Sequence, residues 1–260
     1  MSLIKLSVQS MFYLFLLTSF SNCKKQKEKI AANLVTIKAE TDTISKFPNY
    51  LTKEYVLGLF DYIKNDDFVM IPKEISNKKI YLRKEVLTAF LAMKNAAEKE
   101  NITFTVISGT RNFEHQKNIW NYKWNKKYKK LPPLERAKRI LEFSGMPSTS
   151  RHHWGTDIDI NSLSNSYFSF RKGLKEYNWL LKNASKFGFY QVYTSKEKGR
   201  TGYNEEKWHW SYAPLSKIYL EFYNENISIK DITNFEGFEF AQQLNIIADY
   251  VNGINMDLLK

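Results

Sequence analysis

The segment SRHHWGTDID, residues 150–159, places two histidines and two aspartates within ten positions. The whole chain of 260 residues contains only four histidines, so this concentration needs a physical reason. Imidazole nitrogens and carboxylate oxygens bind zinc, which takes three protein ligands in a catalytic site and leaves a fourth position open for water. A polar surface turn is the alternative interpretation. The segment alone does not decide between them.

A second segment, EKWHW at residues 206–210, combines a carboxylate with another histidine. Glu206 stands three residues before His209. A carboxylate beside a metal can accept a proton from the metal's water, whose pKa the metal lowers to about 7. A solitary histidine in an aromatic strand is more often a hydrogen-bonded core residue than a ligand. Each segment is weak evidence for a metal site, and the two together are stronger.

The alternating sequence TDIDI predicts a strand over residues 156–160. Residues two apart on a strand share a face. Asp157 and Asp159 should therefore point the same way, while Ile158 and Ile160 enter the core.

The other candidate ligands lie beside this strand or on another one. His152 ends the preceding loop, and His209 lies on a second alternating strand predicted over 207–213. Residues three apart on a strand point to opposite faces of the sheet. Glu206 is therefore expected at the entry of that strand, bending back towards the metal.

Helical spacing of apolar residues predicts helices elsewhere in the chain. In the first, over 51–65, Leu57, Leu59, Phe60 and Ile63 lie near one side. The further predicted helices cover 85–101, 111–124, 132–145, 174–188, 214–226 and 238–254, and two further strands cover 102–108 and 189–193. Helices mixed with short strands, without a β-α-β rhythm, indicate an α+β fold. We expect a single domain with a small, mainly antiparallel sheet flanked by helices.

Three blocks, in the same order along the chain, resemble the D-alanyl-D-alanine carboxypeptidase family of zinc peptidases, which includes VanY enzymes and LD-carboxypeptidases. SGTR at 108–111 is similar to the family's S-G-x-R, and Gln116 follows where the family often has glutamine. SRHHWGTDID is similar to S-x-H-x-x-G-x-A-x-D, and EKWHW is similar to E-x-W-H. The resemblance runs from about residue 80 to 215. It implies a hedgehog/DD-peptidase-like fold.

The resemblance also implies a role for each aligned residue. Zinc would be held by three side chains, those of His152, Asp159 and His209. Glu206 would be the general base that activates water and then passes the proton to the leaving amine. Arg111 would stabilise the oxyanion or hold the substrate, to which its fixed guanidinium is suited. Ser150 and Gln116 are candidates for substrate contacts.

One position departs from the family pattern, because Asp157 stands where the family has alanine. Asp157 shares a strand face with Asp159, so either could reach the metal, and the alignment favours Asp159. Asp157 is then expected to contact substrate, a ligand histidine or Arg111. Packing or surface polarity is the expected role of His153 and His115.

The amino terminus has the features of an export signal. Lys5 precedes the apolar run MFYLFLLTSF at 11–20, which is too short to span a bilayer. The run leads to Cys23, the only cysteine, in a context that resembles a bacterial lipoprotein signal with Cys23 as the lipidated residue. A simple secretory signal or an uncleaved anchor is the alternative. The predicted divisions are a signal peptide at 1–23, a polar linker at 24–50, a helical extension at 51–80, a zinc peptidase core at 81–215 and closing helices at 216–260.

The chain is basic, with a formal net charge of +12. Residues 1–29 hold five lysines and one glutamate, a net +4, which leaves +8 for the rest. A basic exported protein suits an anionic cell envelope as well as nucleic acid. Basic and aromatic residues interleave at 118–130, but export argues against a nucleic-acid partner, and none is expected.

The predicted function is hydrolysis of peptidoglycan stem peptides by a zinc-dependent D-alanyl-D-alanine carboxypeptidase, held at the membrane by a lipid anchor. An LD-carboxypeptidase or an endopeptidase at the same site is the alternative, since selectivity depends on loops such as 161–175 and 194–205. A non-catalytic cell-wall-binding lipoprotein is the non-enzymatic alternative. A broken ligand or base position would indicate it, and none is broken.

Overall fold

The computed structural model describes residues 26, 29 and 46–260 of the chain. Residues 49–260 form one compact unit. The predicted signal peptide at 1–23, with Cys23, and most of the predicted linker at 24–50 lie outside the described residues. Within the described part of the chain, no helix is long and apolar enough to cross a membrane.

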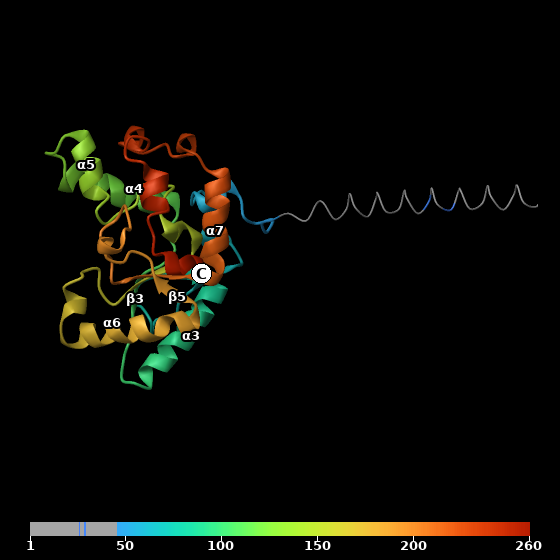
Figure 1. The fold of residues 1–260 in the computed structure, drawn as a ribbon, viewed down its shortest axis with the longest axis vertical. Helices are drawn as coiled ribbons and strands as arrows, with labels where there is room; N and C mark the ends of the chain where they lie inside the picture. Colours follow the sequence, from blue (N-terminus) through green and yellow to red (C-terminus); the bar gives the residue numbers. More distant parts are fainter. Residues whose placement is uncertain (1–25, 27–28, 30–45) are drawn as a thin grey trace, which may run out of the picture. The chain divides into compact units, whose positions relative to one another are not determined.

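Four short strands form an antiparallel sheet that carries two of the segments with candidate metal ligands (Figure 1). In spatial order they are β3 (Val106–Ser108), β4 (Asp157–Ile160), β6 (His209–Tyr212) and β5 (Phe189–Gln191). The strand predicted from TDIDI is confirmed as β4, and the strands predicted over 102–108 and 207–213 are present but shorter. The expected α+β class, with a small antiparallel sheet flanked by helices, is confirmed.

Helices surround this sheet, and a separate two-stranded hairpin pairs β1 with β2. The sequence does not predict the hairpin, because strands of three residues are too short to show alternation. The remaining elements are α2 (Lys53–Val56), β1 (Phe68–Met70), β2 (Tyr81–Arg83), α3 (Lys84–Glu98), α4 (Phe113–Tyr122), α5 (Pro133–Ile140), α6 (Arg171–Asn183) and α7 (Ala213–Asn226). Short 3-10 turns lie at Tyr62–Lys64, Arg151–Trp154, Tyr167–Ser169, Ala184–Phe187, Lys196–Lys198, Ile229–Asp231, Phe238–Phe240 and Met256–Leu259, and π-helical turns at Lys123–Lys127 and Ile246–Val251.

The apolar core explains which way β4 faces. In the view of Figure 1, α3 and α6 lie together on one side of the sheet, and α4 and α5 lie on the other. Ile158 and Ile160 of β4 are fully buried in the same cluster as Phe90 of α3 and Leu180 of α6. Because side chains alternate along a strand, the aspartates of β4 are turned to the opposite face of the sheet.

The helix predicted over 51–65 is wrong. Only α2 and the 3-10 turn at Tyr62–Lys64 form, and Leu59 and Ile63 are 52% and 60% exposed instead of lying on a buried face. Gly58 has a φ of 75°, the left-handed conformation that ends helices. A Cβ added at Gly58 would lie 2.4 Å from Nδ1 of His153, so a contact with a distant segment holds the chain in this turn.

The helix predicted over 238–254 is also wrong. The segment folds into a 3-10 turn at Phe238–Phe240 and a π-helical turn at Ile246–Val251. Between them Asn245 has a φ of 49°, in the left-handed region, which interrupts any continuous right-handed helix.

The packing at Gly58 gives a prediction for stability. Alanine at Gly58 combines the cost of a left-handed φ with the clash against the His153 ring, and we expect it to lower the free energy of unfolding by about 3 kcal/mol. Gly199 is the matched control, because its φ is 86° and no atom lies within 4 Å of an added Cβ. Gly199→Ala should cost about 1 kcal/mol, the conformational part alone. Equal urea midpoints for the two variants would contradict the packing argument.

Candidate metal centre

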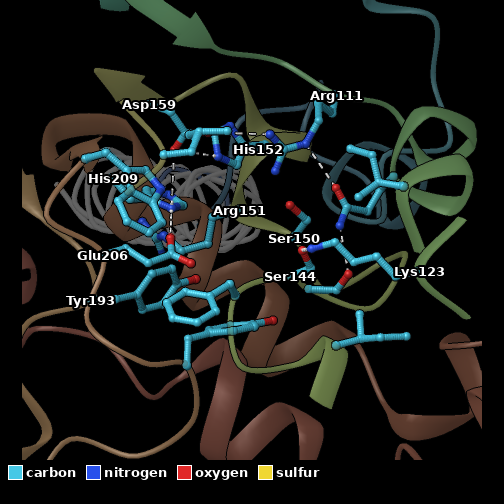
Figure 2. A pocket seen from close by; sticks show the side chains of 18 of the residues that line it. Arg111, Lys123, Ser144, Ser150, Arg151, His152, Asp159, Tyr193, Glu206 and His209 are labelled. Atoms are coloured by element: carbon cyan, nitrogen blue, oxygen red, sulfur yellow. Dashed lines mark hydrogen bonds and ion pairs between the residues drawn. The ribbon is translucent and has the colours of Figure 1, made fainter. Parts of the chain in front are cut away.

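The three side chains predicted to hold zinc converge at one point (Figure 2). Asp159 on β4 stands directly opposite His209 on β6 in the antiparallel register. His152 comes from the 3-10 turn that immediately precedes β4. One ligand atom from each residue lies within 4.8 Å of the others, and all three residues are buried. The convergence follows from strand pairing, because directly opposite residues project from the same face of a sheet.

Hydrogen bonds hold the outer ring nitrogens and turn the inner nitrogens of the two histidines towards the cluster. His152 Nδ1 lies 2.8 Å from the carbonyl oxygen of Gly109, which can only accept, so Nδ1 donates and Nε2 keeps its lone pair. His209 Nε2 lies 2.9 Å from Oδ2 of Asp157, so its other nitrogen, Nδ1, faces the cluster. His152 Nε2 and His209 Nδ1 lie 3.4 and 3.8 Å from Asp159 Oδ1.

The oxygen Oδ1 of Asp159 shows that the site fits a cation. It is buried and accepts no hydrogen bond from any described residue. Burial alone would raise the pKa of Asp159, but His152, His209 and Arg111 lower it to about 2, so the carboxylate is ionised. A buried anionic oxygen without a donor is costly. A zinc ion suits these two nitrogens and one oxygen.

Glu206 lies beside this group, as expected for a residue at the entry of β6. Its Oε2 is 3.0 Å from His209 Nδ1, and its main-chain N–H donates to the carbonyl of Tyr193. Burial raises the pKa of Glu206, and the negative charge of Asp159 acts in the same direction against the hydrogen bond from His209. A raised carboxyl pKa favours proton exchange near neutral pH.

Arg111 lies on the other side of Asp159 and is held rigidly. Its Nη1 is 3.7 Å from Asp159 Oδ2 and donates to Ser108 Oγ, and its Nε donates to Oε1 of Gln116 at 3.0 Å. Gln116 in turn donates from Nε2 to the carbonyl of Gly145. The amide of Gln116 is thus occupied with positioning Arg111.

These groups line a cavity of about 650 Å³. Ser150, the remaining candidate for a substrate contact, is also part of its wall. The cavity therefore brings a metal-binding group, a carboxylate with a raised pKa and a fixed guanidinium to one surface. These are the kinds of group that metal-assisted hydrolysis of an acyl bond requires.

Comparison with known proteins identifies the family. The family model described as VanY, D-alanyl-D-alanine carboxypeptidase, matches residues 79–215, more than half of the chain. This protein belongs to the VanY family. The match spans all three sequence blocks.

Two curated relatives agree with this membership. YodJ of Bacillus subtilis (strain 168), named provisionally as a carboxypeptidase, is 31% identical over 170 residues, which cover 64% of this chain and 57% of YodJ. The D-alanyl-D-alanine carboxypeptidase of Enterococcus faecium is 26% identical over 208 residues, which cover 75% of this chain and 61% of that protein. This VanY-family chain thus spans about three fifths of the length of these relatives.

A solved structure shares the fold. The LdcB LD-carboxypeptidase, whose structure is described as revealing the molecular basis of peptidoglycan recognition, aligns with a TM-score of 0.50 and 26% identity. The alignment covers 66% of this chain and 77% of that chain.

Asp157, the departure from the VanY family pattern, is fully buried behind His209 and is not part of the cavity wall. Its carboxylate accepts from His209, from Arg151 Nε at 3.0 Å and from Ser211 Oγ, with Thr156 Oγ1 as a fourth donor. Burial opposes its ionisation, but Arg151 and then His209 outweigh that effect and hold the pKa of Asp157 below its ordinary value. In this position it orients the imidazole of a candidate ligand.

The other two histidines lie away from the metal-binding group. The ring of His153 is buried between the carbonyl of Arg111, 2.7 Å from Nδ1, and the N–H of Ser148, which donates to Nε2. Burial lowers the pKa of His153 to about 3, so the ring is neutral. His115 is exposed on α4.

The cavity wall also contains residues that the sequence did not single out, among them Lys123, Ser144, Arg151 and Tyr193. Lys123 follows Gln116 by seven residues, two turns of a helix, so helical spacing already places the two on one face. Arg151 lies inside the SRHHWGTDID segment, where an acidic partner for it was also visible. Ser144 and Tyr193 carry no comparable signal.

The buried pair of Arg151 and Asp157 gives a second prediction. Arg151→Met leaves the Asp157 carboxylate buried without its counter-charge, and we expect it to lower the free energy of unfolding by about 3–5 kcal/mol. Adding Asp157→Ala to Arg151→Met removes the buried, uncompensated carboxylate. The double variant should therefore recover part of the lost free energy of unfolding. A double-mutant cycle from urea denaturation measures the coupling. Strictly additive effects would show that the two charges do not compensate each other.

Proposed function

We propose that this protein is a zinc-dependent carboxypeptidase that hydrolyses peptidoglycan stem peptides. The observation that carries the proposal is the buried, donor-free oxygen of Asp159 between two imidazoles, with Glu206 beside it and an open cavity in front. Membership of the VanY family supports the reaction class. The names of the Enterococcus faecium relative and of LdcB support the substrate class.

Each group of residues in the site has a separate role in the proposed reaction. Zinc held by His152, Asp159 and His209 would polarise the scissile carbonyl and lower the pKa of water. Glu206 accepts the proton of the attacking water at a carboxylate oxygen and delivers it to the amine that leaves as the C–N bond breaks. Arg111, positioned by Gln116, offsets the negative charge that develops on the carbonyl oxygen.

Replacing Glu206 tests the proposed base. Glu206→Gln keeps the shape and a polar partner for His209 but cannot take a proton, so hydrolysis should fall by about 10²–10⁴-fold while bound zinc is retained. His209→Ala should lose the metal itself. Zinc content by mass spectrometry and turnover of defined stem peptides measure the two properties separately. Undiminished turnover in Glu206→Gln would refute its role.

The bond that is cleaved distinguishes the alternatives. The Enterococcus faecium relative is named for D-alanyl-D-alanine cleavage and LdcB for LD cleavage, so both specificities stay open for this chain. Mass spectrometry of products from pentapeptide, tetrapeptide and cross-linked substrates separates them from an endopeptidase. A purified, zinc-loaded protein that binds wall fragments and cleaves none of these substrates would instead be a wall-binding lipoprotein.

We also propose that the protein is exported and anchored by a lipid on Cys23. The basis is the apolar run that leads to a single cysteine, followed by the basic segment KKQKEK, which suits anionic lipid head groups. The full chain should incorporate labelled palmitate and sediment with membranes. Cys23→Ser should lose the label and move to the soluble fraction of the envelope. Persistence of both label and sedimentation in Cys23→Ser would contradict the anchor.

A further inference from the structure

The cavity holds a positive charge that the proposed reaction does not use. Lys123 is the first residue of the π-helical turn that extends α4, and its ammonium group donates to the hydroxyl of Ser144. Both residues line the cavity. In Figure 2 they lie on the opposite side of the cavity from His209 and Glu206.

No described carboxylate lies within ion-pair distance of Lys123. Asp159 and Glu206 are the acidic residues of the cavity wall, and both belong to the metal centre. Burial, with contributions from the charges of Lys127 and Arg111, lowers the pKa of Lys123 to about 8, against the opposing charge of Glu206, which lies beyond ion-pair distance. The ammonium group is therefore partly desolvated and makes no ion pair with a described carboxylate, an arrangement that an anion on a bound ligand would stabilise.

The hydrogen-bonding capacity of the pair also suits a carboxylate. An ammonium group has three donors, of which Ser144 occupies one. The hydroxyl of Ser144 accepts from Lys123, so its own proton is free to be donated. The carbonyl of the neighbouring Gly145 accepts a hydrogen bond from Gln116, the residue that positions Arg111. The loop that contains Ser144 is therefore bonded to α4.

We propose that Lys123 and Ser144 form a subsite that binds a carboxylate of the substrate, separate from the groups that act on the scissile bond. The inference rests on the proposed peptidase function for the identity of the ligand. Two carboxylates of a stem peptide have the required chemistry: the C-terminal one and the side-chain carboxylate that the third residue carries in some cell walls. The subsite would make this enzyme selective for substrates that carry the charge.

Matched peptides test the proposal. One pair differs only in carboxylate or carboxamide at the C-terminus, and a second pair differs only in the same way at the third residue. The wild-type protein should prefer the carboxylate in one pair by about tenfold or more, the worth of a charge-assisted hydrogen bond. The pair that shows the preference identifies which carboxylate is bound.

Three variants assign the preference to the subsite. Lys123→Met should raise KM for the preferred carboxylate peptide to that of its carboxamide and leave kcat largely unchanged. Lys123→Arg should retain most of the preference. Lys126→Met is the matched control, because Lys126 lies exposed in the same π-helical turn, away from the cavity wall, and its loss should change nothing. Zinc content and urea midpoints confirm that each variant is folded.

Calorimetric binding of the same peptides to Glu206→Gln separates this inference from the proposed function. Absence of turnover in the wild-type protein would refute the peptidase and leave the binding comparison intact. Loss of affinity for carboxylate and carboxamide peptides alike in Lys123→Met, or no loss for either, would refute the subsite. So would a wild-type protein that binds neither member of either pair.

Discussion

Asp159 and His209 occupy directly opposite positions on two antiparallel strands, and the candidate site is arranged around that pair. A register slip of one residue would turn Asp159 towards the core and Ile158 or Ile160 towards the cavity. The apolar partners of these isoleucines beneath the sheet prevent such a slip, because they can be buried only in one register. The hydrophobic core thus sets the geometry of the polar face that lies above it.

Behind Asp159 and His209 lies a second layer of buried charged residues. Asp157 lies where the VanY family pattern has alanine. The free-energy cost of burying its carboxylate is offset by Arg151, by His209 and by hydroxyl donors. The same carboxylate fixes which nitrogen of His209 faces the cavity. A buried aspartate at this position would be destabilising in apolar surroundings. Here the buried guanidinium of Arg151 compensates its charge, so Asp157 can hold the imidazole of His209 in place.

The helix α4 and its π-helical extension connect the metal centre to the more distant wall of the cavity. Gln116 near its start holds Arg111, and Lys123 just beyond its end faces the same cavity. The loop at Ser144 and Gly145 is bound to both residues. The helix α4 with its extension therefore sets the distance between Arg111 beside the metal centre and the ammonium group of Lys123.

The sequence by itself determined the local features of this protein. The alternation of TDIDI required a strand with both aspartates on one face, and the three ordered blocks indicated the VanY family and its candidate residues. The strand and the family membership are confirmed, because the first depends on neighbours along the chain and the second on short motifs in a fixed order.

Only the tertiary structure decided the features that depend on distant contacts. The turn at Gly58 exists because the ring of His153 lies against it, so helical spacing over 51–65 was misleading. The partner of Asp157 could not be chosen among substrate, histidine and Arg111 until strand pairing placed His209 and Arg151 around it. The position of Lys123 in the cavity wall, with no described carboxylate within ion-pair distance, emerged only from the fold, since desolvation and pairing are properties of a packed surface.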